Sequence, residues 1–145
     1  MTLVEVMMLL VLLALFSAVF IAYLPSLGNL LSVTKTKGAS EEVAMAIRQA
    51  RQLAITEATD HCVNFPAVNQ YQIWRTACGS GTSVEGPVTL SQGAVVTDAS
   101  QTFAFTPIGV TTAGTVTINI TDPSACSVTL TVTAAGGVQL ASPPC

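Results

Sequence analysis

Side chains capable of chemistry are few in this chain of 145 residues, which has eight Asp or Glu, five Lys or Arg and one histidine. That histidine, His61, lies between Asp60 and Cys62. Adjacency in sequence does not make a catalytic dyad, because base and nucleophile must meet in space at hydrogen-bonding distance. The sequence also lacks a phosphate loop, a nucleophile elbow and a paired-carboxylate motif. We therefore predict no enzyme: no catalytic residue, no metal ligand and no cofactor.

The four cysteines are Cys62, Cys78, Cys126 and Cys145. None has C-x-x-C or Cys/His spacing, which disfavours zinc, and their even number predicts two disulfides in an oxidising compartment. Hairpin spacing favours the pairs Cys62–Cys78 and Cys126–Cys145. The second pair assumes a final turn over 134–137, centred between Ala135 and Gly136. Each bond closes a short loop and contributes about 3 kcal/mol in the chain-entropy model.

A carboxylate, Glu5, precedes a run that is apolar from Val6 to Leu24 except for one serine. At 1.5 Å per residue such a run forms roughly 29 Å of helix, enough to cross a bilayer. Because no basic residue precedes Lys35, the run does not fit a secretory signal, and we expect a retained helix. Met1 is then a processed N-terminus from which a basic leader has been removed. Glu5 can either remain among lipid headgroups beside its own amine or pair with the amine of a neighbouring chain.

Helical periodicity continues through residues 25–59 and becomes amphipathic. The apolar positions Val43, Ile47, Ala50 and Ala54 recur at helical spacing, which predicts packing against the segment that follows. Ser40, followed by two glutamates, is typical of an N-cap and indicates a local break near Gly38.

Residues 60–145 are predicted to form a disulfide-bonded antiparallel β domain. Short runs rich in valine, threonine and aromatic residues alternate with turn residues. The predicted strands are 62–65, 71–77, 88–90, 94–96, 102–105, 115–120, 126–132 and 138–140, with a proline-containing turn between the first two. The fold class is therefore α+β: a hydrophobic helix (1–24), its amphipathic continuation (25–59) and a β domain (60–145). This domain has four acids against Arg75, so we expect no nucleic-acid partner for it.

The start Met1-Thr2-Leu3-Val4-Glu5-Val6, with the apolar run after it, resembles the mature N-terminus of type IV pilins and pseudopilins. The stretch Ala46–Ile55 and the segment Phe103–Gly109, followed by a Gly-Gly hairpin, resemble the GspH/FimT branch. The resemblance implies assembly into a helical filament through Met1, Thr2 and Glu5, with Glu5 pairing to a neighbour's N-terminal amine. It also implies N-methylation of Met1, processing by prepilin peptidase, and residence in the inner membrane before export by the pilus assembly machinery to an extracellular filament.

Three functions remain open at this point. The intact apolar helix and the acidic domain favour a principal subunit of a type IV pilus. The branch resemblance favours a minor pilin or pseudopilin of a type II secretion or DNA-uptake apparatus. A membrane-anchored binding or hydrolytic domain is the third possibility, and it requires a pocket containing His61.

Overall fold

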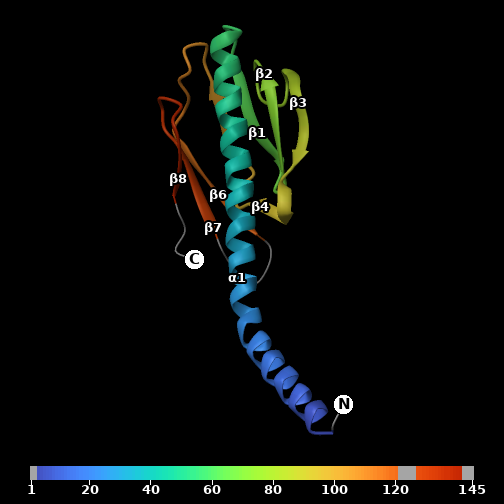
Figure 1. The fold of residues 1–145 in the computed structure, drawn as a ribbon. Coiled ribbons are helices and arrows are strands. Elements are labelled where there is room, and N and C mark those ends of the chain that lie inside the picture. Colours follow the sequence, from blue (N-terminus) through green and yellow to red (C-terminus); the bar gives the residue numbers. More distant parts are fainter. Residues whose placement is uncertain (1–2, 121–126, 142–145) are drawn as a thin grey trace. The chain divides into compact units, whose positions relative to one another are not determined.

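The computed structural model describes the backbone of residues 3–120 and 127–141, with side chains at 3–21, 33–119 and 127–141. Its first element is the helix α1, Leu3–Thr56, of 54 residues (Figure 1). The chain divides into two compact units, Met1–Leu31 and Ser32–Cys145, and α1 contributes to both.

The predicted break near Gly38 is wrong, because α1 continues through Pro25, Gly38 and Ser40. Ser40 is fully buried, and its hydroxyl donates back to the carbonyl of Lys37 at 2.8 Å. A serine within a helix can satisfy its hydroxyl in this way, so a cap-like sequence does not require a helix end. Burial of the apolar stripe on either side of Ser40 stabilises the continuous helix.

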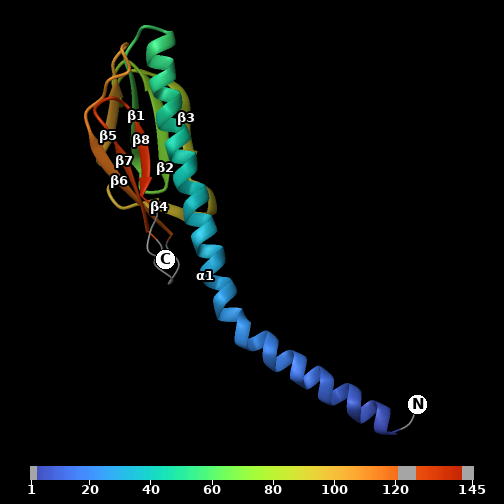
Figure 2. The same cartoon turned by 60° about the vertical axis from the view of Figure 1, so that its left-hand side comes forward.

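Two antiparallel sheets complete the second unit. The first sheet has the order β3-β2-β1-β5 and contains β1 (His61–Ala67), β2 (Gln70–Arg75), β3 (Thr82–Thr89) and β5 (Thr102–Phe105). The second has the order β4-β6-β7-β8 and contains β4 (Ala94–Val96), β6 (Gly114–Ile120), β7 (Ser127–Val132) and β8 (Val138–Ala141). A 3₁₀ turn, η1 (Ser91–Gly93), precedes β4. The second half of α1 runs alongside the strands of both sheets (Figures 1 and 2).

One hydrophobic core joins the second half of α1 to both sheets. The predicted helical stripe is confirmed, since Val43, Ile47, Ala50 and Ala54 are all 0% exposed. The predicted alternation of the strands is confirmed as well: Phe103 and Phe105 on β5, Val116 and Ile118 on β6, and Val128, Leu130 and Val132 on β7 are buried. The observed fold is therefore α+β, as the sequence predicts.

Most strand boundaries differ from the prediction by one or two residues, and the largest differences are in β3 and at the end of β1. β3 begins at Thr82, six residues before the predicted start at Val88. It is a largely exposed edge strand that contains Gly86 and Pro87, so it has no burial pattern for the sequence to reveal. Pro66 lies inside β1 at a register irregularity, beyond the last residue that pairs with β5, and not in the turn.

The final hairpin is shifted by one residue from the predicted register. Val132 lies opposite Val138 and Leu130 opposite Leu140, so the turn is centred on Ala135. Gly136 has φ +74°, and its amide donates to the carbonyl of Thr133 at 2.8 Å. A left-handed glycine that ends the turn produces a three-residue loop. The Cys126–Cys145 pair depends on this register, and both cysteines lie outside the described residues.

Candidate functional site

The N-terminal part of α1 has the properties of a membrane span. Residues Leu3–Ile21 have a mean hydropathy of 2.7, and none of this stretch is buried within the chain. Every described side chain in it is exposed, from Leu3 at 79% to Ile21 at 66%. An apolar helix exposed on all sides is stable only in lipid or among other helices.

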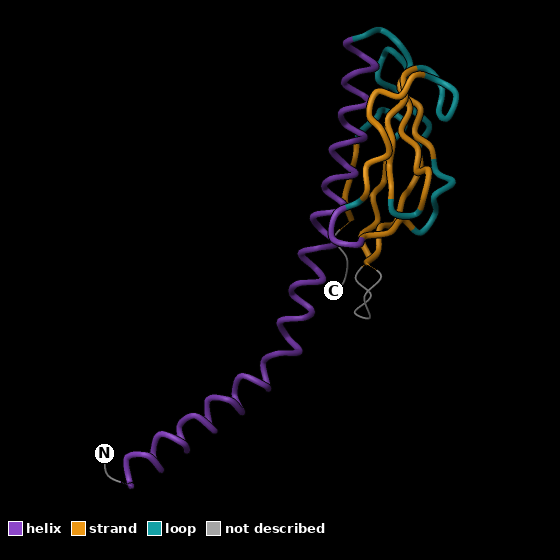
Figure 3. The backbone as a smooth tube through the Cα atoms, turned by 90° about the vertical axis from the view of Figure 1, so that its right-hand side faces the viewer, coloured by secondary structure: helices purple, strands orange, loops and turns teal. Residues whose placement is uncertain are grey.

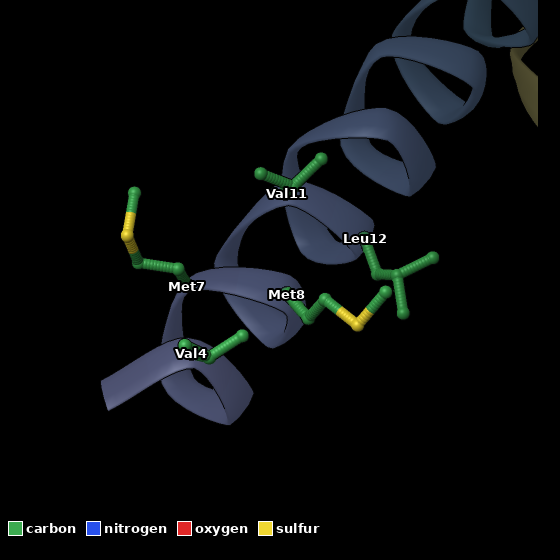
Figure 4. Close-up of a pocket in the computed structure, with 5 residues that line it drawn as sticks. All are labelled: Val4, Met7, Met8, Val11 and Leu12. Carbon is green, nitrogen blue, oxygen red and sulfur yellow. The ribbon is translucent and has the colours of Figure 1, made fainter. Parts of the chain in front are cut away.

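The side chains on the surface of this stretch are almost all apolar. Val4, Met7, Met8, Val11 and Leu12 line a shallow hollow, and Figure 4 shows the side chains of Met7, Met8 and Leu12 projecting away from the ribbon. Ser17, the one polar residue between Val6 and Ile21, donates its hydroxyl to the carbonyl of Ala14 at 2.9 Å. Its hydrogen bond is therefore made within the helix.

Glu5 lies in the first turn of α1, where its negative charge is favourable to the helix dipole. Of the three predicted assembly residues, only Glu5 is described, because Met1 and Thr2 lie outside the described residues. Pairing of Glu5 with an N-terminal amine therefore remains a prediction.

The single histidine helps to fasten the end of α1 to the first sheet. His61 is fully buried, and its Nδ1 lies 3.0 Å from the carbonyl oxygen of Thr59. Its Nε2 lies 3.4 Å from Glu57 Oε2, close enough for an ion pair but without hydrogen-bond geometry. The guanidinium of Arg75, at the end of β2, donates to the same Glu57 oxygen. A fully buried His61 does not line an open pocket.

The Cys62–Cys78 disulfide predicted from hairpin spacing is present, with a Cα–Cα distance of 5.4 Å. Cys62 pairs in register with Trp74, so Cys78 lies four residues beyond the direct partner. A turn after β2 brings it back: Thr76 has φ +74° and Gly79 has φ +78°. The adjacent Cys62 is therefore oxidised and cannot act as a nucleophile beside His61.

Two acidic groups have shifted pKa values. Burial raises the pKa of Tyr71 above its ordinary 10.0, and the carboxylates of Glu85 and Glu42 raise it further. Hydrogen bonds from Ser100 and Gln101 lower the pKa of the Asp98 carboxyl. Among the residues that the structure describes, no three His, Cys, Asp or Glu side chains gather in a way that could hold a metal ion.

Two glycine loops meet the helix at Arg51. The Nε of Arg51 donates to the carbonyl of Gly109, in the loop after β5, at 3.2 Å. A Cβ placed on Gly136, in the loop after β7, would lie 2.5 Å from that same carbonyl oxygen and 2.7 Å from Arg51 Nε. Both glycines have positive φ, so any other residue would be strained here.

A comparison with models of known protein families identifies the family of this chain. Residues 39–136 match the family model described as Type II transport protein GspH. The chain belongs to the GspH family. No curated protein matches the sequence.

Solved structures with a similar fold agree with the GspH assignment. The type IV minor pilin FimU of Pseudomonas aeruginosa has 18% sequence identity and a TM-score of 0.61, and the match covers 77% of this chain and 93% of FimU. The minor pseudopilin EpsH, from the Type 2 Secretion System of Vibrio cholerae, has 15% identity and a TM-score of 0.58. That match covers 74% of this chain and 97% of EpsH. The fold of this GspH-family chain is therefore that of the pilins and pseudopilins.

The meeting of loops at Arg51 was not predicted from the sequence. The signals were present, since Gly109 ends the Thr-Pro-Ile-Gly segment and Gly136 belongs to the Gly-Gly hairpin of the GspH-like resemblance. A single sequence shows that these glycines permit turns. It does not show that two turns from different sheets meet one side chain of α1.

Proposed function

We propose that the protein is a minor pilin or pseudopilin, a non-catalytic subunit that enters a type IV pilus-like or type II secretion filament through α1. The observation that carries this proposal is the fully exposed apolar stretch Leu3–Ile21 on a chain of the GspH family. Before assembly this stretch spans the inner membrane, after prepilin peptidase has removed a leader and Met1 has been N-methylated. Assembly then carries the subunit into an extracellular filament.

The minor role is preferred to that of a principal subunit. The sequence favoured a principal subunit, with a minor pilin or pseudopilin as the alternative. FimU and EpsH, which are among the similar solved structures, are a minor pilin and a minor pseudopilin. We assign no catalytic role, because His61 is buried against Thr59 and Glu57 and Cys62 is held in a disulfide.

Glu5 sets the position of the subunit in the filament. Moving an apolar helix from lipid into a bundle of apolar helices changes the hydrophobic free energy little, because both environments are apolar. A carboxylate in that bundle needs a cation, and the N-terminal amine of a neighbour's Met1 is the one that the family's assembly supplies. At about 4 Å and an effective dielectric near 20, the attraction is roughly 4 kcal/mol. Misplaced neighbours lack this pair, so only one axial position is favoured.

The test compares Glu5→Val with a matched control, Ser17→Val, in the full chain. Both changes remove the polar group of one exposed residue in the same helix. We expect both variants to insert into the membrane and to form the Cys62–Cys78 bond. Glu5→Val should then reduce the amount in sheared filaments about tenfold or more, because the neighbour's amine becomes an uncompensated buried cation. Ser17→Val should leave that amount at the parental level, since its hydroxyl bonds only within the helix.

Filaments of Glu5→Val at the parental level would end the pairing proposal. Absence of the parental protein from every filament and pseudopilus preparation would end the proposed function itself.

A further inference from the structure

One face of the first sheet points away from the core. Val63 and Ile73 are buried in the core, and side chains alternate along a strand, so the positions next to them lie on the opposite, outer face. Among the residues that the structure describes α1 is the one α-helix, and Figure 3 shows its second half along one side of the strands. No described helix covers the outer face. We call five of its partly or fully exposed residues the tryptophan face: Asn64, Gln72, Trp74, Ser83 and Thr102.

The indole of Trp74 is held along this face by a hydrogen bond. Its Nε1 donates to Oδ1 of Asn64 at 3.0 Å. In the register Trp74 lies opposite Cys62, and Asn64 is two residues further along β1, so the ring extends diagonally over the sheet. Trp74 remains partly exposed. Part of the indole therefore forms a flat apolar surface that is open to solvent.

Two amides beside the indole have fixed orientations. An indole N–H can only donate, so the Asn64 amide turns its oxygen towards Trp74 and keeps its NH₂ group as a donor for a ligand. The hydroxyl of Ser83 donates to the carbonyl of Glu85 at 3.0 Å and accepts from Nε2 of Gln72 at 3.1 Å. The amide oxygen of Gln72 is then the acceptor for a ligand. Asn64 and Gln72 pair directly across β1 and β2, so a donor and an acceptor lie side by side next to an aromatic ring.

The tryptophan face carries no charge. Arg75 of β2 pairs in register with His61, and Glu85 of β3 pairs with Ile73. Both partners are 0% exposed on the inner face, and residues directly opposite each other share a face of the sheet. The strands β1 and β5 contain no Asp, Glu, Lys or Arg. Phosphates, carboxylates and nucleic acids, which are recognised through charge, therefore do not match this face.

The chemistry of the tryptophan face matches a sugar. One face of a sugar ring consists of C–H groups, which pack on the negative face of an aromatic ring, and the hydroxyls at its edge both donate and accept. A protein interface has an apolar core with several large side chains, whereas Trp74 is the one large apolar member here. Thr102, Asn64 and Gln72 form a polar row across three adjacent strands, roughly 10 Å wide. A row of this width is longer than one sugar ring and favours a chain of sugars.

We propose that the tryptophan face binds a neutral glycan, a chain of uncharged hexose or N-acetylhexosamine units. One ring packs on Trp74, and its hydroxyls bond to the amides of Asn64 and Gln72. The inference goes beyond the proposed function, because anchoring and assembly through α1 need no sugar. It gives the folded domain a ligand of its own.

Calorimetric titration of the full chain, in a detergent without a sugar headgroup, tests the binding. The probes are laminarihexaose, maltohexaose and hexa-N-acetylchitohexaose, and a heparin hexasaccharide is the charged control. We expect saturable binding of at least one neutral hexasaccharide with a Kd of about 1 mM or tighter, and no such binding of the heparin fragment. The bound hexasaccharide should also shift the emission of Trp74, the single tryptophan, to shorter wavelength.

Substitutions then locate the site. Trp74→Ala should weaken the binding by at least about tenfold, and Gln72→Ala should weaken it several-fold. Gln52→Ala removes an exposed glutamine amide from α1 and is the matched control, which should bind as the parent does. An intact Cys62–Cys78 bond and a parental circular dichroism spectrum verify folding. If Trp74→Ala fails to fold, Gln72→Ala decides, because Gln72 lies outside the core.

The remaining outcomes overturn the inference. Absence of saturable binding to all three neutral hexasaccharides refutes it, and so does binding of the heparin fragment that is as tight as theirs. Binding that is unchanged in folded Trp74→Ala or in Gln72→Ala, or that Gln52→Ala weakens equally, does not occur on the tryptophan face and also refutes it. None of these results concerns entry into filaments, so the proposed function is judged separately by the Glu5→Val comparison.

Discussion

The two halves of α1 have the same backbone conformation and opposite surroundings. From Leu3 to Ile21 every side chain is exposed, and nearly all are large and apolar. From Val33 to Thr56 most apolar positions lie in one stripe that is buried against the chain's own sheets, whereas Met45 and Ile55 are exposed. The second half therefore completes its packing within the chain, whereas the first half needs lipid or other helices. Foldability and assembly are encoded in different parts of one helix.

The largest expected effect on stability comes from shortening a side chain in the buried stripe of α1. Ile47→Ala should destabilise the second unit by about 2–5 kcal/mol, because Ile47 is 0% exposed and its removal leaves a cavity in the core. Leu12→Ala, in the other half of α1, should leave that stability unchanged, since Leu12 is 51% exposed. Urea unfolding of the detergent-solubilised chain, followed through the single Trp74, measures both. Equal effects of the two changes would contradict the division of α1.

Opening the disulfide should weaken the second unit without changing membrane insertion by the first. The Cys62–Cys78 bond spans 16 residues, so the double variant Cys62→Ala with Cys78→Ser should lose about 3 kcal/mol. The same unfolding measurement reports this loss, and alkaline extraction of membranes reports insertion. A variant that leaves the membrane fraction would show that the two properties are coupled.

Glycines in α1 and in the loops should respond in opposite directions. Gly38 is inside the helix with no atom within 4 Å of an added Cβ, so Gly38→Ala should stabilise the second unit by roughly 0.5–1 kcal/mol. Gly136→Ala should destabilise it by at least about 1 kcal/mol, because Gly136 has φ +74° and contacts Arg51. If Gly38→Ala is destabilising, α1 does not run continuously through this position in solution.

The smallest expected effect is a dependence on alkaline pH at the face where Tyr71 meets the second half of α1. The folded pKa of Tyr71 is raised, first by burial and then by Glu85 and Glu42. Stability from the neutral phenol is therefore fully present below about pH 10, its ordinary pKa, and is lost as pH rises through the higher folded pKa. Tyr71→Phe should remove this part of the alkaline loss. Identical pH profiles of parent and variant between pH 9 and 11 would contradict it.

The sequence predicted most of the second unit because burial there follows simple periods. Val43 and Ile47 recur with the helical period, and Val116 and Ile118 with the strand period, and each pair is buried as expected. The errors fall where tertiary contacts override local signals. Ser40 has the sequence of a cap and lies within a continuous helix, and β3 contains Gly86 and Pro87 because an exposed edge tolerates them.

Of the candidate sites, one was found from the sequence and one was not. Glu5 was found from sequence because a carboxylate before an apolar run is unusual, and its pairing with a neighbour's amine remains a prediction. The meeting of two loops at Arg51 could not be found, because Arg51, Gly109 and Gly136 come from three separate segments that only the fold brings together. No local period connects them.

The buried stripe of α1 also bears on the order of events during synthesis. The helix emerges first, yet its contacts at Arg51 are with Gly109 and Gly136, which are made near the end of the chain. The apolar stripe of α1 therefore stays exposed until the strands that cover it have been synthesised. Five of its buried positions, Ala39, Ala44, Ala46, Ala50 and Ala54, are alanines. Alanine has a high helix propensity and exposes little apolar surface. The unpacked helix therefore stays formed and has little apolar surface available for non-native association.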